Sequence, residues 1–310
     1  MSDRTLGASD LEVSRLCLGG NVFGWTADEQ ESFAVLDAFA EGGGTFVDTA
    51  DVYSVWVDGN RGGESEEILG RWMAARGNRD SMVIATKVAK HPDLRGLSPE
   101  NVRKAVEGSL TRLGTDVIDL YYAHEDDEAT PLEQTLGVFD ELVREGKVRT
   151  LGASNFSAAR LAESLSVSER EGLASYVAVQ PQYNLVERDE YEGELAGVVT
   201  GSGLSCVPYY GLASGFLTGK YRPGQDVDSA RAGTAGRYLD DRGTALLGVL
   251  DDVAAAHDTT VAAVSLAWLV AQPGVTSAIA SARTPRQLAD LLPVDGLELT
   301  GEEVARLDAA

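Results

Sequence analysis

The sequence predicts a single α/β domain, a (β/α)8 TIM barrel that spans residues 1–310. The first support is the alternation of eight short apolar runs with longer segments of helical periodicity. The second is that no long linker divides these segments. A doubly wound open sheet is the alternative. That fold would place a Gly-x-Gly-x-x-Gly turn after a strand, and the sequence contains no such spacing.

The predicted strands are short runs rich in apolar and β-branched residues. In chain order they are Arg15–Gly19, Thr45–Val47, Met82–Thr86, Val117–Tyr122, Val148–Leu151, Tyr176–Val179, Ser205–Val207 and Ser277–Ala280. A small hairpin from Thr5 to Val13 precedes them, and we expect it to close the bottom of the barrel.

Helical segments follow the strands at residues 28–41, 64–76, 99–112, 132–145, 157–171, 188–201 and 259–272, with a last pair at 284–292 and 300–308. Ser98 before Pro99, and Thr130 before Pro131, predict capped helix starts. Gly114 stands just past a helix end, where a left-handed residue is needed. Gly146 stands at the matching place after another helix.

The stretch from residue 211 to 241 is too long and too rich in Gly, Ser and Asp for a simple connection between a strand and a helix. Long ordered loops on a barrel rim are usually functional. We therefore predict a long loop after the seventh strand that covers the cofactor or the substrate.

Composition excludes several functions. A net charge of −23 would repel nucleic acid and an anionic membrane surface. No apolar run approaches the about 20 residues that cross a bilayer. The N-terminus lacks the features of a signal peptide, which predicts a cytoplasmic protein. Neither the two cysteines nor the three histidines show metal-ligand spacing, so we expect no metal site.

Reactive side chains follow three consecutive predicted strands. Asp48 and Tyr53 follow the second, Lys87 the third and His124 the fourth. Because the carboxyl ends of neighbouring parallel strands share one rim, these groups can converge on one pocket. Taken singly, each residue could also be a turn cap, a core-edge ring or a solvated charge. Together they suit proton donation to a carbonyl oxygen, since an adjacent ammonium lowers the pKa of a phenol.

These motifs resemble the aldo-keto reductase family over nearly the whole chain. The matching elements are Asp48-Thr49-Ala50-Asp51-Val52-Tyr53, Gly63-Glu64-Ser65-Glu66, Ala85-Thr86-Lys87 and Tyr122-Ala123-His124. The resemblance implies that Asp48, Tyr53, Lys87 and His124 form a catalytic tetrad. Tyr53 is then the general acid when a carbonyl is reduced.

The same resemblance implies an NADPH site. Its expected residues are Ser154, Asn155 and Gln180 at the nicotinamide carboxamide, Tyr209 stacked on the nicotinamide ring, Leu212, Ser214, Leu217 and Lys220 over the pyrophosphate, and Ser281, Arg283, Gln287 and Asp290 around the adenosine phosphate. The chain departs from the family pattern at Gly211 and at Leu291, where a proline and an adenine-binding asparagine are common.

The sequence therefore predicts an NADPH-dependent reductase of aldehydes or ketones, with a small carbonyl compound as its partner. Trp25, Trp56, Tyr210 and Phe216 are candidate pocket walls. Two alternatives remain open. One is a Schiff-base aldolase that uses Lys87. The other is an NADPH-binding redox-sensing subunit with slow turnover. Neither the substrate nor the oligomeric state can be read from the sequence.

Overall fold

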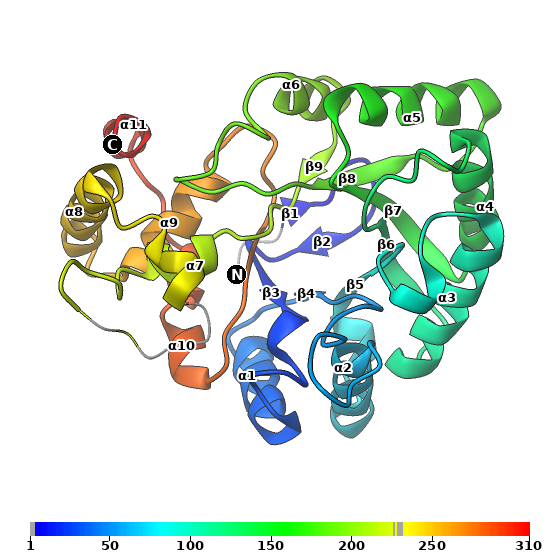
Figure 1. Cartoon of the computed structure of the whole chain (residues 1–310), viewed down its shortest axis with the longest axis horizontal. Helices are drawn as coiled ribbons and strands as arrows, with labels where there is room; N and C mark the ends of the chain where they lie inside the picture. The colour runs from blue at the N-terminus through cyan, green and yellow to red at the C-terminus, as the bar shows by residue number, and fades with distance from the viewer. Residues whose placement is uncertain (1–3, 226, 228–231) are drawn as a thin grey trace.

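A computed structural model describes residues 4–225, 227 and 232–310. Its main sheet has eight parallel strands in the order β10-β3-β4-β5-β6-β7-β8-β9 (Figure 1). Their bounds are β3 Leu16–Gly19, β4 Phe46–Asp48, β5 Val83–Val88, β6 Ile118–Ala123, β7 Val148–Ser154, β8 Tyr176–Gln180, β9 Ser205–Cys206 and β10 Ala278–Ala280. All eight coincide with predicted strands.

Hydrogen bonds also link the two ends of this strand order. The Thr276 N–H donates to the Cys206 carbonyl at 2.9 Å, and the Ile279 N–H donates to the Pro208 carbonyl at 3.1 Å. The sheet is thus curled so that β9 and the chain around β10 meet. This arrangement is consistent with the predicted α/β barrel.

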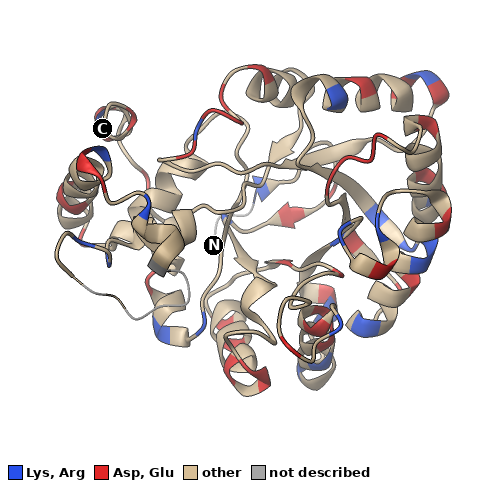
Figure 2. Cartoon of the chain, in the orientation of Figure 1, with Lys and Arg blue, Asp and Glu red and all other residues tan. Residues whose placement is uncertain are grey.

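Helices lie outside the curled sheet (Figure 1). Their bounds are α1 Glu29–Glu41, α2 Glu64–Arg76, α3 Pro99–Leu113, α4 Leu132–Arg144, α5 Ala158–Glu171, α6 Glu194–Gly201, α7 Ala232–Gly236, α8 Asp241–Ala256, α9 Val261–Val270, α10 Pro285–Ala289 and α11 Gly301–Asp308. Figure 2 shows acidic residues recurring along the outer helices. Among the described residues no single helix is long and apolar enough to cross a membrane, although the bent pair α8–α9 passes that test by length and composition.

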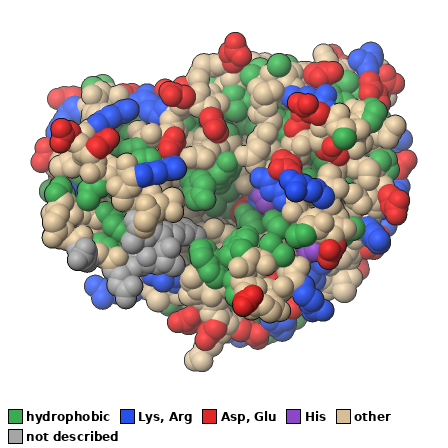
Figure 3. Space-filling model, in the orientation of Figure 1, with side chains coloured by type: hydrophobic (Ala, Val, Ile, Leu, Met, Phe, Trp, Pro, Cys, Tyr) green, Lys and Arg blue, Asp and Glu red, His purple; other side chains and the backbone are tan. Residues whose placement is uncertain are grey.

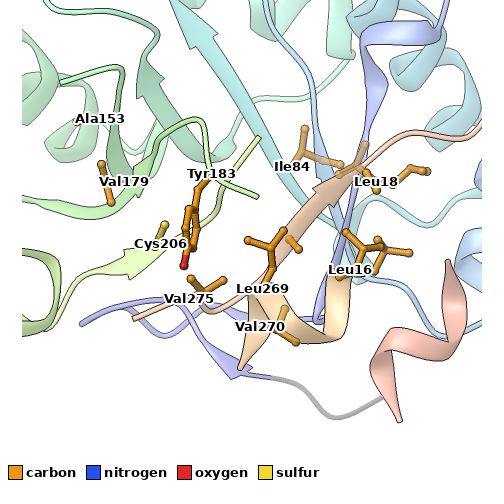
Figure 4. Packing of buried hydrophobic residues seen from close by; sticks show 14 of the residues in the cluster. Leu16, Leu18, Ile84, Ala153, Val179, Tyr183, Cys206, Leu269, Val270 and Val275 are labelled. Carbon is orange, nitrogen blue, oxygen red and sulfur yellow. The ribbon is translucent and has the colours of Figure 1, made fainter. Parts of the chain in front are cut away.

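Side-chain alternation along the strands builds two apolar layers. Leu16 and Leu18 of β3 belong to the cluster between sheet and helices, together with Leu269 and Val270 of α9 (Figure 4). Cys17, which lies between the two leucines, faces the barrel interior. The interior cluster contains Leu6, Leu11, Val13, Cys17, Phe46, Ala85, Leu120, Tyr122, Ala178, Val207 and Ile279.

The predicted N-terminal hairpin is present. Strands β1 Arg4–Thr5 and β2 Glu12–Val13 pair antiparallel. Leu6, Leu11 and Val13 are buried in the interior cluster, so the hairpin covers one end of the barrel with apolar side chains. This burial confirms the expected closure.

The structure differs from the sequence-based prediction in three helical regions. Helix α8 was not expected from the sequence, because Gly243 and Gly248 weaken the local helix signal. It forms because Asp240 caps it, accepting from the Gly243 N–H at 2.7 Å, and because it buries an apolar face. The helix predicted from residue 188 begins only at Glu194. Thr130 does not cap α4; its hydroxyl donates to Asp127 instead.

The predicted long loop after the seventh strand is not confirmed as one loop. The stretch from 211 to 241 contains the 3-10 segment η4 Ala213–Thr218 and helix α7. Residues 226 and 228–231 of this stretch lie outside the described residues.

Candidate active site

The predicted catalytic residues lie at one rim of the barrel because they stand at the carboxyl ends of adjacent strands. Asp48 is the last residue of β4, and His124 follows the end of β6. Lys87 lies inside β5, one residue before its end, rather than after the strand as predicted. Tyr53 lies in the turn that leaves β4. The structure therefore brings all four to one end of neighbouring strands.

Asp48, Lys87 and Tyr53 form a closed hydrogen-bonded triangle. The buried Lys87 ammonium donates to Asp48 Oδ2 at 2.6 Å, to the Thr49 carbonyl at 2.8 Å and to the Tyr53 hydroxyl at 2.9 Å. The Tyr53 hydroxyl in turn donates to Asp48 Oδ2 at 3.0 Å. Gln180 Nε2 donates to the other carboxylate oxygen, Asp48 Oδ1, at 2.9 Å. Every donor of the lysine ammonium has an acceptor, so its position is well defined.

Electrostatics in this triangle differ from the sequence-based expectation. Burial, reinforced by the Asp48 carboxylate, raises the pKa of Tyr53 well above its usual value, although we expected Lys87 to lower it. Burial lowers the pKa of Lys87, and Asp48 opposes that effect. Burial disfavours the charged phenolate most, and the negative charge of Asp48 and the hydrogen bond that the phenol donates to it act in the same direction. The resting tyrosine is therefore protonated, which is the form that a general acid needs.

His124 is 9% exposed and stands beside the triangle, with its ring centroid 6.2 Å from that of Tyr53. Burial lowers the pKa of His124 well below its usual value, and the nearby ammonium groups of Lys87 and Lys90 act in the same direction. The imidazole is thus neutral at physiological pH. A neutral imidazole can donate one hydrogen bond to a substrate oxygen without adding a charge.

A cavity of about 710 Å³ opens above the triangle, within the size range of small-molecule sites. Figure 3 shows this hollow, with hydrophobic side chains around it and Lys or Arg side chains beside a histidine at its edge. The predicted residues that line it are Asp48, Tyr53, His124, Ser154, Asn155, Gln180, Tyr209, Leu212, Ser214, Lys220, Ser281, Arg283, Gln287, Asp290, Trp25, Trp56 and Tyr210. Lys87 lies beneath the lining and reaches it through Tyr53.

Two of the residues predicted to cover the cofactor or to wall the pocket do not reach the cavity. Phe216 and Leu217 are fully buried in the hydrophobic core. The Phe216 ring packs against Tyr238 at a centroid distance of 5.6 Å. Phe216 is therefore not a wall of the substrate pocket, and Leu217 does not cover the cavity. Both residues lie in η4, which turns their apolar side chains inward rather than toward the cavity.

The polar residues expected at the nicotinamide are held by one another. Asn155 has a left-handed backbone, with φ of 59°. Its Nδ2 donates to the His124 carbonyl at 2.8 Å and to Ser154 Oγ at 3.0 Å, and its Oδ1 accepts from the Tyr209 hydroxyl at 2.8 Å. This network orients an amide at the cavity wall, next to the hydrogen-bonded triangle of Asp48, Lys87 and Tyr53.

A strained turn lines the other end of the cavity. Tyr210, Ala213, Ser214 and Gly215 have positive φ values of 57°, 46°, 57° and 94°. Non-glycine residues rarely adopt this conformation, and where they do, the site is often functional. Turns of this kind point successive N–H groups into a concavity that binds anions.

Two of the three cations at the cavity wall, Lys220 and Arg283, belong to the predicted cofactor site. The Arg283 guanidinium has no carboxylate within ion-pair distance among the described residues. The strained turn and these cations fit the phosphates of a dinucleotide, because each supplies donors to negative oxygens.

Asn21 and Lys90 are among the lining residues that the sequence did not single out. Asn21 Oδ1 accepts from the Ser281 hydroxyl at 2.7 Å. Asn21 and Lys90 each lie a few residues after a predicted strand, as the tetrad residues do. That position could have identified them as residues of the same rim. Asp51 was quoted only as part of a motif. It is buried, and burial together with the neighbouring Glu66 raises its pKa to about 8.

Comparison with known proteins agrees with this geometry. The model of the family described as Aldo/keto reductase family matches residues 15–310. The chain belongs to the aldo/keto reductase family. Members of this family are oxidoreductases that generally use NADPH or NADH.

Proteins similar to this chain are named as oxidoreductases or reductases and as a channel subunit. "Uncharacterized oxidoreductase YrpG" of Bacillus subtilis is 36% identical over 98% of this chain and 94% of its own length. "Probable voltage-gated potassium channel subunit beta" of Oryza sativa is 33% identical over 100% of this chain and 96% of its own length. "Norsolorinic acid reductase stcV" of Emericella nidulans is 31% identical over 96% and 78%, respectively.

Proposed function

We propose that this protein reduces an aldehyde or a ketone to the alcohol with NADPH. The observation that carries the proposal is the triangle at the floor of the cavity, where the Tyr53 hydroxyl lies 2.9 Å from the Lys87 ammonium. A protonated phenol held next to a buried cation can release its proton to a carbonyl oxygen and leave a stabilised phenolate.

The bound nicotinamide would supply the hydride that reduces the carbonyl carbon. Tyr53 donates its proton to the carbonyl oxygen, which becomes the alcohol. Lys87 stabilises the developing phenolate through the hydrogen bond at 2.9 Å, and Asp48 holds the lysine in place. His124 donates a hydrogen bond to the same oxygen from a neutral ring. Because the tetrad is largely buried, these interactions act with little screening by water.

We infer a preference for NADPH over NADH from the charge distribution. The 2′-phosphate adds negative charge to a ligand that approaches a protein of net charge −23. Only a local cation can turn that phosphate into an advantage. Arg283 lines the cavity and has no carboxylate partner among the described residues, so its planar guanidinium is available for the phosphate.

The test is consumption of NADPH, followed by absorbance, with a panel of aldehydes, ketones and keto-sugars. The Tyr53→Phe variant keeps the ring and removes the proton. Its turnover should fall by about 10²–10⁴ while its NADPH affinity stays close to that of the parent. Parent-level turnover in the variant would exclude Tyr53 as the acid. Trapping of substrate on Lys87 by borohydride would instead support the aldolase alternative.

A second candidate function is a redox-sensing subunit that binds NADPH and turns over slowly. The names of the relatives from Oryza sativa and Arabidopsis thaliana favour it, since both are described as probable channel beta subunits. Rapid hydride transfer in a single turnover followed by slow release of the oxidised cofactor would support this candidate. Fast steady-state turnover would contradict it.

A further inference from the structure

Lys90 is a cation at the catalytic end of the cavity that the proposed mechanism does not use. It lies two residues after the end of β5 and lines the cavity together with Tyr53 and His124. Its ammonium is close enough to His124 to help lower the pKa of that imidazole. The other two cations of the lining are Lys220 and Arg283. In the proposed function they bind the phosphates of the dinucleotide, which leaves only Lys90 without a role.

The backbone just before Lys90 is strained. Ala89 is buried and has a φ of 119°, a conformation that suits glycine rather than alanine. Its carbonyl accepts from the Gly96 N–H at 2.9 Å, and this bond holds the turn. Strained residues of this kind cluster at binding and catalytic sites, where the surrounding structure enforces them. Here the strain occurs at the point where the chain turns from β5 to present Lys90 to the cavity.

The charge of Lys90 is only partly balanced by the protein. Its nearest carboxylate oxygen, Glu125 Oε2, is 3.9 Å from the ammonium, beyond hydrogen-bond distance. Arg95 approaches the other oxygen of the same carboxylate at 4.0 Å and therefore shares it. The Lys90 side chain is only 33% exposed, so water does not fully solvate the ammonium, and burial lowers its pKa. An anion in the cavity would complete its environment.

We propose that Lys90 binds an anionic group of the substrate, so that this protein prefers aldehydes or ketones that carry a carboxylate or a phosphate. This inference rests on the proposed carbonyl reduction and adds the substrate class. The aromatic side chains of Trp25, Trp56 and Tyr210 line the same cavity and suit the apolar part between carbonyl and anion. Trp25 and Trp56 stack edge to face at 5.7 Å, which makes a firm wall for that part.

The test uses substrates that differ only in charge. The parent enzyme and the Lys90→Met variant are compared with 4-carboxybenzaldehyde, with its neutral methyl ester and with 4-formylphenyl phosphate, all with NADPH. For the parent we expect a lower KM for an anionic compound than for the ester. In the variant, kcat/KM for that anion should fall about tenfold more than kcat/KM for the ester, as expected for the loss of one charged hydrogen bond. Comparing the two anions shows which of them the site accepts.

Two further variants separate binding from fold effects. Glu125→Gln removes the carboxylate that competes for Lys90, so it should lower the KM for the anion. If the Lys90–Glu125 contact were merely structural, both variants would change anion and ester alike. Lys104→Met removes the same unit of charge at an exposed side chain of α3 that does not line the cavity, and it should leave the ratio of anion to ester near that of the parent.

The possible failures are distinguishable. If no carbonyl compound is reduced by the parent, the proposed function fails. If the ester is reduced but the anions are not preferred, or if Lys90→Met affects them all equally, the proposed function stands and the inference about Lys90 is wrong.

Discussion

The hydrogen-bonded triangle makes a quantitative prediction about folding, because its ion pair is buried. Asp48 is 1% exposed and Lys87 is fully buried. Lys87→Met would leave the Asp48 carboxylate with donors from Tyr53 and Gln180 but with no cation, and would remove the donor to the Thr49 carbonyl. Breaking a buried pair on one side costs about 3–5 kcal/mol of the free energy of unfolding. Asp48→Asn should cost about as much, because it strands the ammonium.

The double variant should be far less destabilised than the two single changes together. Asp48→Asn with Lys87→Met leaves no buried charge, so the remaining losses are the hydrogen bond to the Thr49 carbonyl and small changes in packing, about 1–3 kcal/mol. The single losses add to about 6–10 kcal/mol, so the coupling between the two sites should be at least about 3 kcal/mol.

Urea unfolding of the cofactor-free protein at neutral pH, followed by circular dichroism, measures all three variants against the parent. The dependence of the free energy of unfolding on urea concentration must be the same in all four proteins before their unfolding midpoints are compared. All three variants should be poor catalysts, so activity does not distinguish them. The prediction concerns stability: each single variant should be strongly destabilised, and the double variant much less than the sum of the two. Additivity of the two single losses to within about 0.5 kcal/mol would refute the buried ion pair as described.

Three other predictions concern single residues. Arg283→Ala should weaken NADPH binding by about 1.5–3 kcal/mol and change NADH binding little in fluorescence titrations; equal losses for both would contradict its role at the phosphate. Asp51 has a folded-state pKa raised to about 8, so its contribution to stability is present at low pH and is lost as the pH rises toward 8. The Tm of the parent should therefore fall between pH 6 and pH 9, and it should fall less in Asp51→Asn. An equal fall of Tm in both proteins would show that ionisation of Asp51 does not cause it. Ala89→Gly should stabilise the fold by about 1 kcal/mol in urea unfolding, because relief of a left-handed alanine exceeds the added entropy of glycine; destabilisation would show that Ala89 is not strained.

Local patterns in the sequence were sufficient for the strands and for most helices. The eight strands of the sheet were predicted because each is a short apolar run followed by turn residues, a signal that does not depend on the rest of the chain. Helix α8 was missed because two glycines mask a pattern whose apolar face is stabilised only by packing against the core. Phe216 and Leu217 were assigned to the cavity for a related reason: their distance along the chain from Tyr209 does not reveal which way η4 turns them.

The sequence by itself determined that Asp48, Tyr53, Lys87 and His124 share one rim, since parallel strands end on the same side of a barrel. Their bonding and ionisation depended on the tertiary structure. Burial and the contact with Asp48 keep Tyr53 protonated, and both arise from groups that only folding brings together. The same holds for Lys90, whose place at the cavity depends on a strained backbone at Ala89 that no residue-type pattern predicts. Strand ends follow from local composition, whereas pKa values and cavity walls follow from distances between residues far apart in the chain.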